Sequence, residues 1–185
     1  MGACSTSGYS ARSPEPKPYN SFGNGAAMRV SPCGFIAKTE EEAKLLSREV
    51  TKVTHNHPEG LKGAEAATIA IFMARQGAGI QEIRQRVARD YYGLGFTLDG
   101  IRAHYRFNET CQGTVPQAII AFLESVSFED AVRNAISIGG DSDTLAAITG
   151  AIAQAYYGVP EPLGDEALGY LDTQLLDIYI EWETR

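Results

Sequence analysis

The 185-residue sequence lacks the features of a membrane span, a disulfide scaffold or a nucleic-acid binder. Its most apolar stretches, residues 64–74 and 145–157, are shorter than the roughly 20 residues that a membrane-spanning helix needs. Its cysteines, Cys4, Cys33 and Cys111, are far apart and form no CxxC pair, so neither a zinc site nor a disulfide framework is indicated. Asp and Glu (23) outnumber Lys and Arg (16), whereas binding to nucleic acid favours the opposite balance. We therefore expect no membrane and no nucleic-acid partner.

What is present is an ordinary globular composition. Hydrophobic residues make up 44% of the chain and charged residues 21%, which suits one domain with a core of useful size. The net charge of −7 is typical of a soluble, cytoplasmic protein. Residues 13–18 read Ser-Pro-Glu-Pro-Lys-Pro, and such a run cannot continue a helix. We expect an irregular segment over residues 1–18 and one folded domain over residues 19–185.

Within this domain the apolar residues repeat every three or four positions, which predicts helices. No convincing alternating strand is present, and residues 92–112, rich in Gly and aromatic side chains, are ambiguous. Thr39 and Ser127 stand where N-caps are expected, and Gly158 where a helix should end. The predicted fold class is all-α, a compact orthogonal helical bundle. The expected helices cover residues 40–53, 64–75, 80–91, 115–123, 127–138, 141–157 and 165–183.

The sharpest candidate site is the run Gly-Gly-Asp-Ser-Asp-Thr at residues 139–144. Its two glycines permit a tight turn, and Asp141 and Thr144 share a face if a helix starts here. Together with Asp143 they offer hard oxygen ligands, the kind that Mg²⁺, Ca²⁺ or Mn²⁺ prefers. The alternative is helix capping, in which these side chains accept the free amides of the first turn. The residue types alone leave both interpretations open.

A second candidate is the glycine-rich run Ser-Phe-Gly-Asn-Gly at residues 21–25. Gly23 and Gly25 leave backbone amides open, and a helix is expected to follow. A helix N-terminus with exposed amides suits a phosphate, and Phe22 could stack on a base or a ribose. The alternative is an ordinary Asn-Gly turn.

The third candidate is the histidine run Thr-His-Asn-His-Pro at residues 54–58. Pro58 favours an extended His57, and in an extended run His55 and His57 point the same way. They could then hydrogen-bond a sugar or a phosphate, or they could be ordinary loop histidines. His104 has no such neighbours, and we expect it at the surface.

In this order, the three runs resemble the ADP-ribosylglycohydrolase family, over about residues 18–160. The resemblance implies an all-α fold and cleavage of the glycosidic bond that joins ADP-ribose to a protein or a small acceptor, usually with Mg²⁺ or Mn²⁺. It implies that Asp141, Asp143 and Thr144 are metal ligands and that the two aspartates are also catalytic. The substrate contacts that it implies are Ser21, Phe22, Gly23, Asn24, Gly25, His55 and His57.

One departure from the family pattern stands out. Members carry an N-terminal Thr-Asp-Asp or Ser-Asp-Asp run that supplies further metal ligands, and this chain contains no Asp-Asp pair. We therefore expect an N-terminally truncated member with an incomplete metal site. Loss of neighbouring helices would also expose apolar surface, which favours a homo-oligomer or a complementing chain. The functions that compete are an ADP-ribosyl hydrolase, an ADP-ribose-binding pseudoenzyme and an inactive truncated member.

Overall fold

The computed structural model describes residues 17–184, so the predicted irregular segment 1–18 lies outside the described residues except for its last two. Within residues 17–184 the secondary structure consists of eleven helices and a single isolated bridge between Gly23 and Thr110. The predicted all-α class is confirmed. The helices are α1 (Gly25–Met28), α2 (Ser31–Ile36), α3 (Glu40–Lys52), α4 (Pro58–Arg75), α5 (Ile80–Asp90), α6 (Leu98–Arg102), α7 (Cys111–Leu123), α8 (Phe128–Ser137), α9 (Ser142–Tyr157), α10 (Glu161–Leu168) and α11 (Thr173–Glu183).

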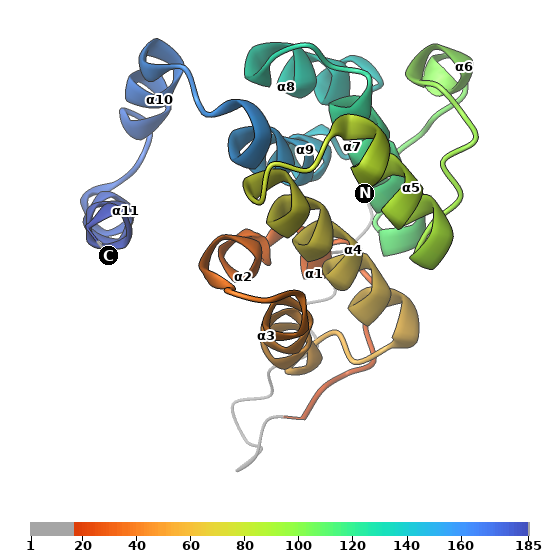
Figure 1. Ribbon diagram of the computed structural model, residues 1–185, viewed down its shortest axis with the longest axis horizontal. Helices are drawn as coiled ribbons and strands as arrows, with labels where there is room; N and C mark the ends of the chain where they lie inside the picture. The colour runs from red at the N-terminus through yellow and green to blue at the C-terminus, as the bar shows by residue number, and fades with distance from the viewer. Residues whose placement is uncertain (1–16, 185) are drawn as a thin grey trace, which may run out of the picture.

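Helices α4, α7 and α9 form the centre of the bundle, and each packs on the other two (Figure 1). Their sequences are apolar on nearly all sides, and a helix of that kind is buried in a core. The largest side chains that they bury include Phe122, Ile69 and Ile148. Helix α3 packs on α4, α8 packs on both α7 and α9, and α1 and α2 lie against α4 and α9. The first turn of α9, with the acidic run, is only partly buried, because Asp143 is exposed and Asp141 is half-buried.

Several predicted helix ends are confirmed by hydrogen bonds. Thr39 Oγ1 accepts from the amide of Glu42 at 3.2 Å, and Ser127 Oγ accepts from the amide of Asp130 at 3.1 Å. Gly158 follows α9 with φ +75°, in the left-handed region that favours glycine. Local sequence chemistry thus determined these ends.

The predicted start of one central helix is wrong, and another central helix extends beyond its predicted apolar part. Helix α4 begins at Pro58, a residue type that suits the first turn of a helix, six residues before the apolar run 64–75. Helix α7 begins at Cys111, because Thr110 caps it and its Oγ1 accepts from the amide of Gly113 at 3.1 Å. Pro116 therefore lies inside α7, where it has no amide to continue the helical hydrogen bonding.

The last predicted helix, 165–183, is also wrong, because two helices occupy this region. Helix α10 starts earlier, at Glu161, and α11 starts at Thr173. Asp172 interrupts the run, since its Oδ1 accepts from the amide of Leu175 at 2.9 Å and so caps a new helix. Helices α10 and α11 form an arm beside the bundle (Figure 1), and neither forms a closely packed pair with α1–α9.

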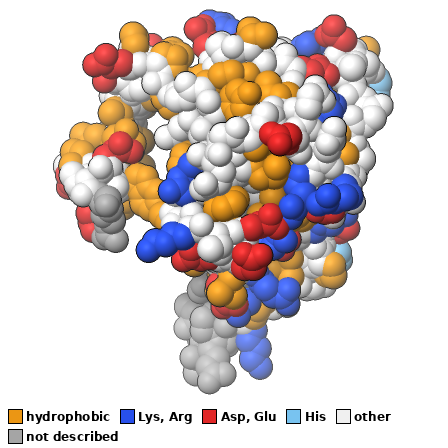
Figure 2. Space-filling view, in the orientation of Figure 1, with side chains coloured by type: hydrophobic (Ala, Val, Ile, Leu, Met, Phe, Trp, Pro, Cys, Tyr) orange, Lys and Arg blue, Asp and Glu red, His pale blue; other side chains and the backbone are white. Residues whose placement is uncertain are grey.

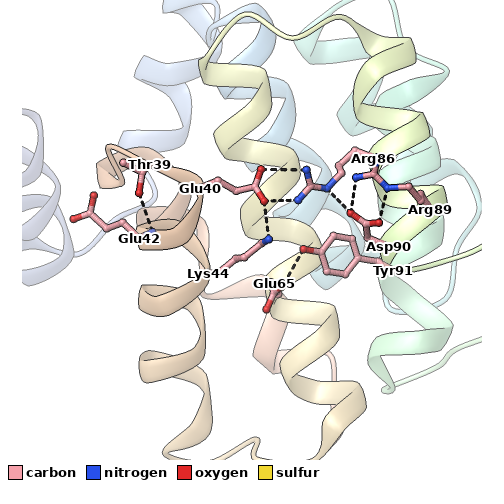
Figure 3. Close-up of polar contacts among 9 residues, drawn as sticks. All are labelled: Thr39, Glu40, Glu42, Lys44, Glu65, Arg86, Arg89, Asp90 and Tyr91. Atoms are coloured by element: carbon pink, nitrogen blue, oxygen red, sulfur yellow. Dashed lines mark hydrogen bonds and ion pairs between the residues drawn. The ribbon is translucent and has the colours of Figure 1, made fainter.

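A polar network joins α3, α4 and α5 on the surface (Figure 3). The guanidinium of Arg86 forms a forked ion pair with Glu40 and a second pair with Asp90 at 2.6 Å. Tyr91 donates to Glu65 of α4 at 2.8 Å, and Lys44 pairs with Glu40 at 2.6 Å. The hydrogen bond from Arg86 is the largest cause of the lowered pKa of Glu40. The network holds α5 in place beside α3 and α4.

Among residues 17–184, no helix combines the length and the apolar character that crossing a lipid bilayer requires.

Candidate active site

A glycine turn places the acidic run at the start of α9. Gly139 and Gly140 have φ values of +71° and +74°, which favour glycine over any residue with a Cβ. A Cβ on Gly140 would also stand 2.7 Å from a ring carbon of Tyr105. The two glycines therefore let the chain turn sharply against Tyr105 and enter α9 at Asp141. This confirms the tight turn that the sequence predicts.

Asp141 occupies the N-cap position of α9 but makes no side-chain cap hydrogen bond. Its Oδ2 instead accepts from the side-chain amide of Asn24 at 2.6 Å. Asp143 and Thr144 both interact with the Asp141 carboxyl, and the buried Thr144 hydroxyl lies 3.8 Å from the sulfur of Met28. Ordinary capping therefore does not account for Asp141, and the three oxygen-bearing side chains gather at one point.

The pKa values of the two carboxyl groups are shifted in opposite directions. Partial burial raises the pKa of Asp141, and the neighbouring Asp143 adds to this effect, while the Asn24 amide opposes it. The pKa of Asp143 is lowered, first by its hydrogen bond with Asp141 and then by the backbone amides of Thr144 and of Asp143 itself. A close pair of carboxylates holds a proton or a cation more readily than either would alone. The two carboxylates together therefore favour the binding of a positive charge.

The oxygen donors at this point are of the type that a hard divalent cation prefers, but they are too few to complete its coordination shell. Asp141, Asp143 and Thr144 supply only oxygen donors, which suits Mg²⁺ or Mn²⁺. Mg²⁺ prefers octahedral coordination, so water or substrate would have to supply the other positions. Among the described residues, no three His, Cys, Asp or Glu side chains come together as a metal site.

The glycine-rich run forms a short turn that leads into α1. It pairs with the chain before α7, because Asn24 N donates to Glu109 O at 2.7 Å and Cys111 N donates to Phe22 O at 2.9 Å. Ser21 Oγ accepts from the amide of Gly23 at 3.1 Å. Two amides of the run, those of Gly23 and Asn24, are thus engaged within the protein. The helix that follows has only four residues.

The exposed side of this run carries an aromatic ring and a cation. Phe22 is 44% exposed, and its ring lies 5.2 Å from the ring of His57. Arg29 is exposed, and its Nε donates to the carbonyl of Gly25 at 2.6 Å. An exposed aromatic ring and an exposed guanidinium on one short segment suit a ligand that carries both a base or sugar and a phosphate.

The two histidines of the third run contact the glycine-rich run. His55 is buried, and its Nε2 lies 3.5 Å from where a Cβ on Gly23 would stand. Burial lowers the pKa of His55, and Arg29 lowers it further, which favours a neutral ring. His57 caps α4, because its Nδ1 accepts from the amide of Glu59 at 3.1 Å. The sequence analysis did not assign this capping role.

Asn24 connects the three runs, and it does so through residues that the sequence analysis missed. Its side-chain amide also donates to Thr114 Oγ1 at 3.0 Å and to the carbonyl of Asn108 at 3.2 Å. Thr114 Oγ1 in turn donates to Asn108 O at 2.9 Å. These residues lie in or next to the ambiguous segment 92–112. The one available signal was Asn108 two residues before Thr110, an arrangement typical of a turn that leads into a capped helix.

Comparison with known proteins identifies the family of the chain. The family model described as ADP-ribosylglycohydrolase matches residues 2–179. The chain belongs to the ADP-ribosylglycohydrolase family. A solved structure titled "ADP-ribosylglycohydrolase-related protein complex" has a TM-score of 0.66 and 25% sequence identity, with 82% of this chain and 57% of that chain covered. The family resemblance noted in the sequence is confirmed.

Curated relatives in the family come from animals and bacteria. Human ADP-ribosylhydrolase ARH3 is 28% identical over 84% of this chain and 56% of its own length. The ADP-ribosyl-[dinitrogen reductase] glycohydrolase of Rhodospirillum rubrum is 28% identical over 88% of this chain and 53% of its own length. The ADP-ribosylarginine hydrolase Tri1 of Pseudomonas putida is 26% identical over 74% and 39%. The chain thus spans about half the length of the curated relatives that it matches.

Proposed function

We propose that this chain is an ADP-ribosyl hydrolase, which releases ADP-ribose from a modified protein or a small acceptor in the cytoplasm. The observation that carries the proposal is the 2.6 Å hydrogen bond between Asn24 and Asp141. It joins the candidate substrate loop to the candidate cation site, although the two lie 117 positions apart in the chain. Capping α9 would not require that contact, because Asp141 makes no cap hydrogen bond.

In this proposal the substrate contacts are Ser21, Phe22, Gly23, Asn24, Gly25, His55 and His57. The exposed Phe22 ring, backed by His57, offers a face for the adenine or a ribose. Because the amides of Gly23 and Asn24 already donate within the protein, Arg29 and the amide of Gly25 are the better candidates to hold the pyrophosphate. The neutral His55 ring is placed to hydrogen-bond a sugar hydroxyl.

Asp141, Asp143 and Thr144 would hold Mg²⁺ or Mn²⁺ in this proposal. A bound divalent ion would orient the ribose hydroxyls and make a coordinated water more acidic. The lowered pKa of Asp143 keeps this exposed carboxylate ionised, so it can orient the attacking water, and it would accept the proton of that water once the divalent ion had made the water more acidic. The Asp141 carboxylate, restrained by Asn24, stabilises the positive charge that develops at the anomeric carbon. The bond to the acceptor breaks as the bond to water oxygen forms.

Calorimetric titration with ADP-ribose, first with Mg²⁺ and then with EDTA, tests the binding part of the proposal. We expect binding that depends on Mg²⁺ and that is weakened at least about tenfold in Asp141→Asn. The matched control is Asp177→Asn, which removes the same charge from the exposed face of α11. If ADP-ribose does not bind to the folded protein in either condition, the proposal is wrong.

Release of ADP-ribose from an ADP-ribosylated protein tests the catalytic part. We expect Asp143→Asn to lower the rate about a hundredfold, because it removes the group that accepts the proton of water. Unchanged turnover in this variant would refute the role of Asp143.

A second candidate function is an ADP-ribose-binding pseudoenzyme, and the small number of carboxylates at the site favours it. Within residues 17–184, Asp141 and Asp143 are the carboxylates that meet there, with Thr144 as a third oxygen donor. A pseudoenzyme would bind ADP-ribose equally well with Mg²⁺ or EDTA and would show no turnover. The two assays above therefore separate the hydrolase from the pseudoenzyme.

A further inference from the structure

The arm formed by α10 and α11 exposes more apolar surface than any other part of the described chain. Tyr170, Leu175 and Ile178 are 83%, 51% and 57% exposed. At 100° per residue, the apolar residues of α11 cover more than half of its circumference. A helix with such a broad apolar surface is normally buried between two neighbours. The apolar residues of α11 and of the turn before it are Leu171, Leu175, Leu176, Ile178, Tyr179, Ile180 and Trp182.

An apolar groove separates this arm from the bundle. The groove has a volume of about 570 Å³, and one wall consists of Leu171, Leu175, Ile178, Tyr179, Trp182 and Glu183 of the arm. The opposite wall consists of Ser31, Pro32 and Phe35 of α2 and Gln154 of α9. In Figure 2 the gap between the arm and the bundle is visible, with orange side chains on the arm. The arm borders this groove but leaves it unfilled.

The charges of the arm and of the bundle differ. Residues 158–184 contain seven of the 23 Asp and Glu residues and none of the 16 Lys and Arg residues. With Arg185 included, residues 158–185 carry a net charge of −6, whereas residues 1–157, with sixteen acidic and fifteen basic side chains, carry −1. Two arms in contact with each other alone would repel.

The bundle wall of the groove is next to cations. Lys38 follows α2, and its side chain is exposed. Arg75 donates to the carbonyl of Ala37, at the end of α2, at 2.9 Å. Lys and Arg side chains lie along the edge of the bundle that faces the arm (Figure 2). An acidic, apolar helix is therefore complementary to this wall both in charge and in hydrophobicity.

We propose that two copies of this chain pair by exchanging arms, so that α11 of each copy packs in the α2–α9 groove of the other. One chain carries both complementary surfaces, and reciprocal exchange uses each surface once in a closed two-fold dimer. The arm is joined to the bundle through Gly158, where φ is +75°, and its two helices are joined by the turn 169–172. The proposal does not depend on the catalytic function.

Sedimentation equilibrium of the full chain tests the oligomeric state. We expect a dimer whose dissociation constant rises about 30-fold or more in Ile178→Gln, since truncating a central interface residue has an effect of that size. The matched control is Leu45→Gln on α3, because Leu45 is 58% exposed and Ile178 is 57% exposed. The control should remain as dimeric as the wild type. Circular dichroism checks that each variant keeps its helices.

Disulfide trapping identifies which arm occupies the groove. In a Cys4→Ser background, we expect a copy carrying Ser31→Cys to form a disulfide with a separate copy carrying Ile178→Cys. Cys33 and Cys111 are buried, so they do not compete. A wild-type monomer, an assembly larger than two, or a disulfide that forms only within a chain carrying both substitutions would each overturn the proposal. None of these results would change the expected binding of ADP-ribose.

Discussion

Asn24 is the residue whose replacement tests the site most directly, because its side chain joins the substrate loop, the start of α7 and the start of α9. Its amide donates to Asp141 Oδ2 at 2.6 Å, to Thr114 Oγ1 at 3.0 Å and to Asn108 O at 3.2 Å. The nitrogen carries two hydrogens, so these contacts amount to two full hydrogen bonds. Asn24→Ala removes both from a residue that is only 7% exposed, where water cannot easily replace them.

The magnitude follows from the type of each bond. A hydrogen bond to a carboxylate contributes about 2 kcal/mol and a neutral one about 1 kcal/mol. We therefore expect Asn24→Ala to lower the free energy of unfolding by about 3 kcal/mol. At about 3 °C per kcal/mol for a chain of this size, Tm falls by about 9 °C. The affinity for Mg²⁺ should also fall by about tenfold, because Asp141 loses the group that orients it.

Urea denaturation and a Mg²⁺ titration of the same samples measure these two effects. The control is Asn56→Ala, because Asn56 is exposed and its side chain accepts a single hydrogen bond among the described residues, from Asn20 N at 2.8 Å. We expect Asn56→Ala to lower the free energy of unfolding by about 0.5 kcal/mol. Equal losses in the two variants would refute the reasoning, since they would mean that the buried amide contributes no more than an exposed one.

Three further predictions concern the turn, the buried histidine and the surface network. In calorimetry, Gly140→Ala should lower the free energy of unfolding by about 2 kcal/mol more than Gly139→Ala. Both glycines have positive φ, but only a Cβ on Gly140 would meet an aromatic ring, that of Tyr105 at 2.7 Å. Burial lowers the pKa of His55, so the unfolded chain binds a proton more readily than the folded one. Stability should therefore fall as the pH drops below about 6.5, and by less in His55→Gln, as followed by denaturation at several pH values. In urea denaturation, Arg86→Met should lower the free energy of unfolding by about 1 kcal/mol, and by less at high salt. Arg89→Met should leave the free energy of unfolding unchanged, because the Arg89 side chain is 68% exposed.

The sequence by itself determined the fold class and most of the helices, because both depend on local patterns. Apolar residues at helical spacing identified α3, α5, α8 and α9, and side-chain caps such as Thr39 and Ser127 set where α3 and α8 begin. The same local chemistry explains the errors. Asp172 splits the last predicted helix by capping α11, and an apolar stripe alone does not reveal such a break.

The candidate site was predicted as three separate runs, and the tertiary structure decided how they meet. Asn24 and Asp141 were both singled out, but nothing local to either residue shows that one donates to the other across 117 positions. Asn108 and Thr114 were missed for the same reason, since they act on the site only through Asn24. Whether Asp141 capped a helix or faced a ligand depended on which atoms folding brought to its carboxylate. The sequence determines which chemical groups the chain carries, and packing of distant segments determines which of them come into contact.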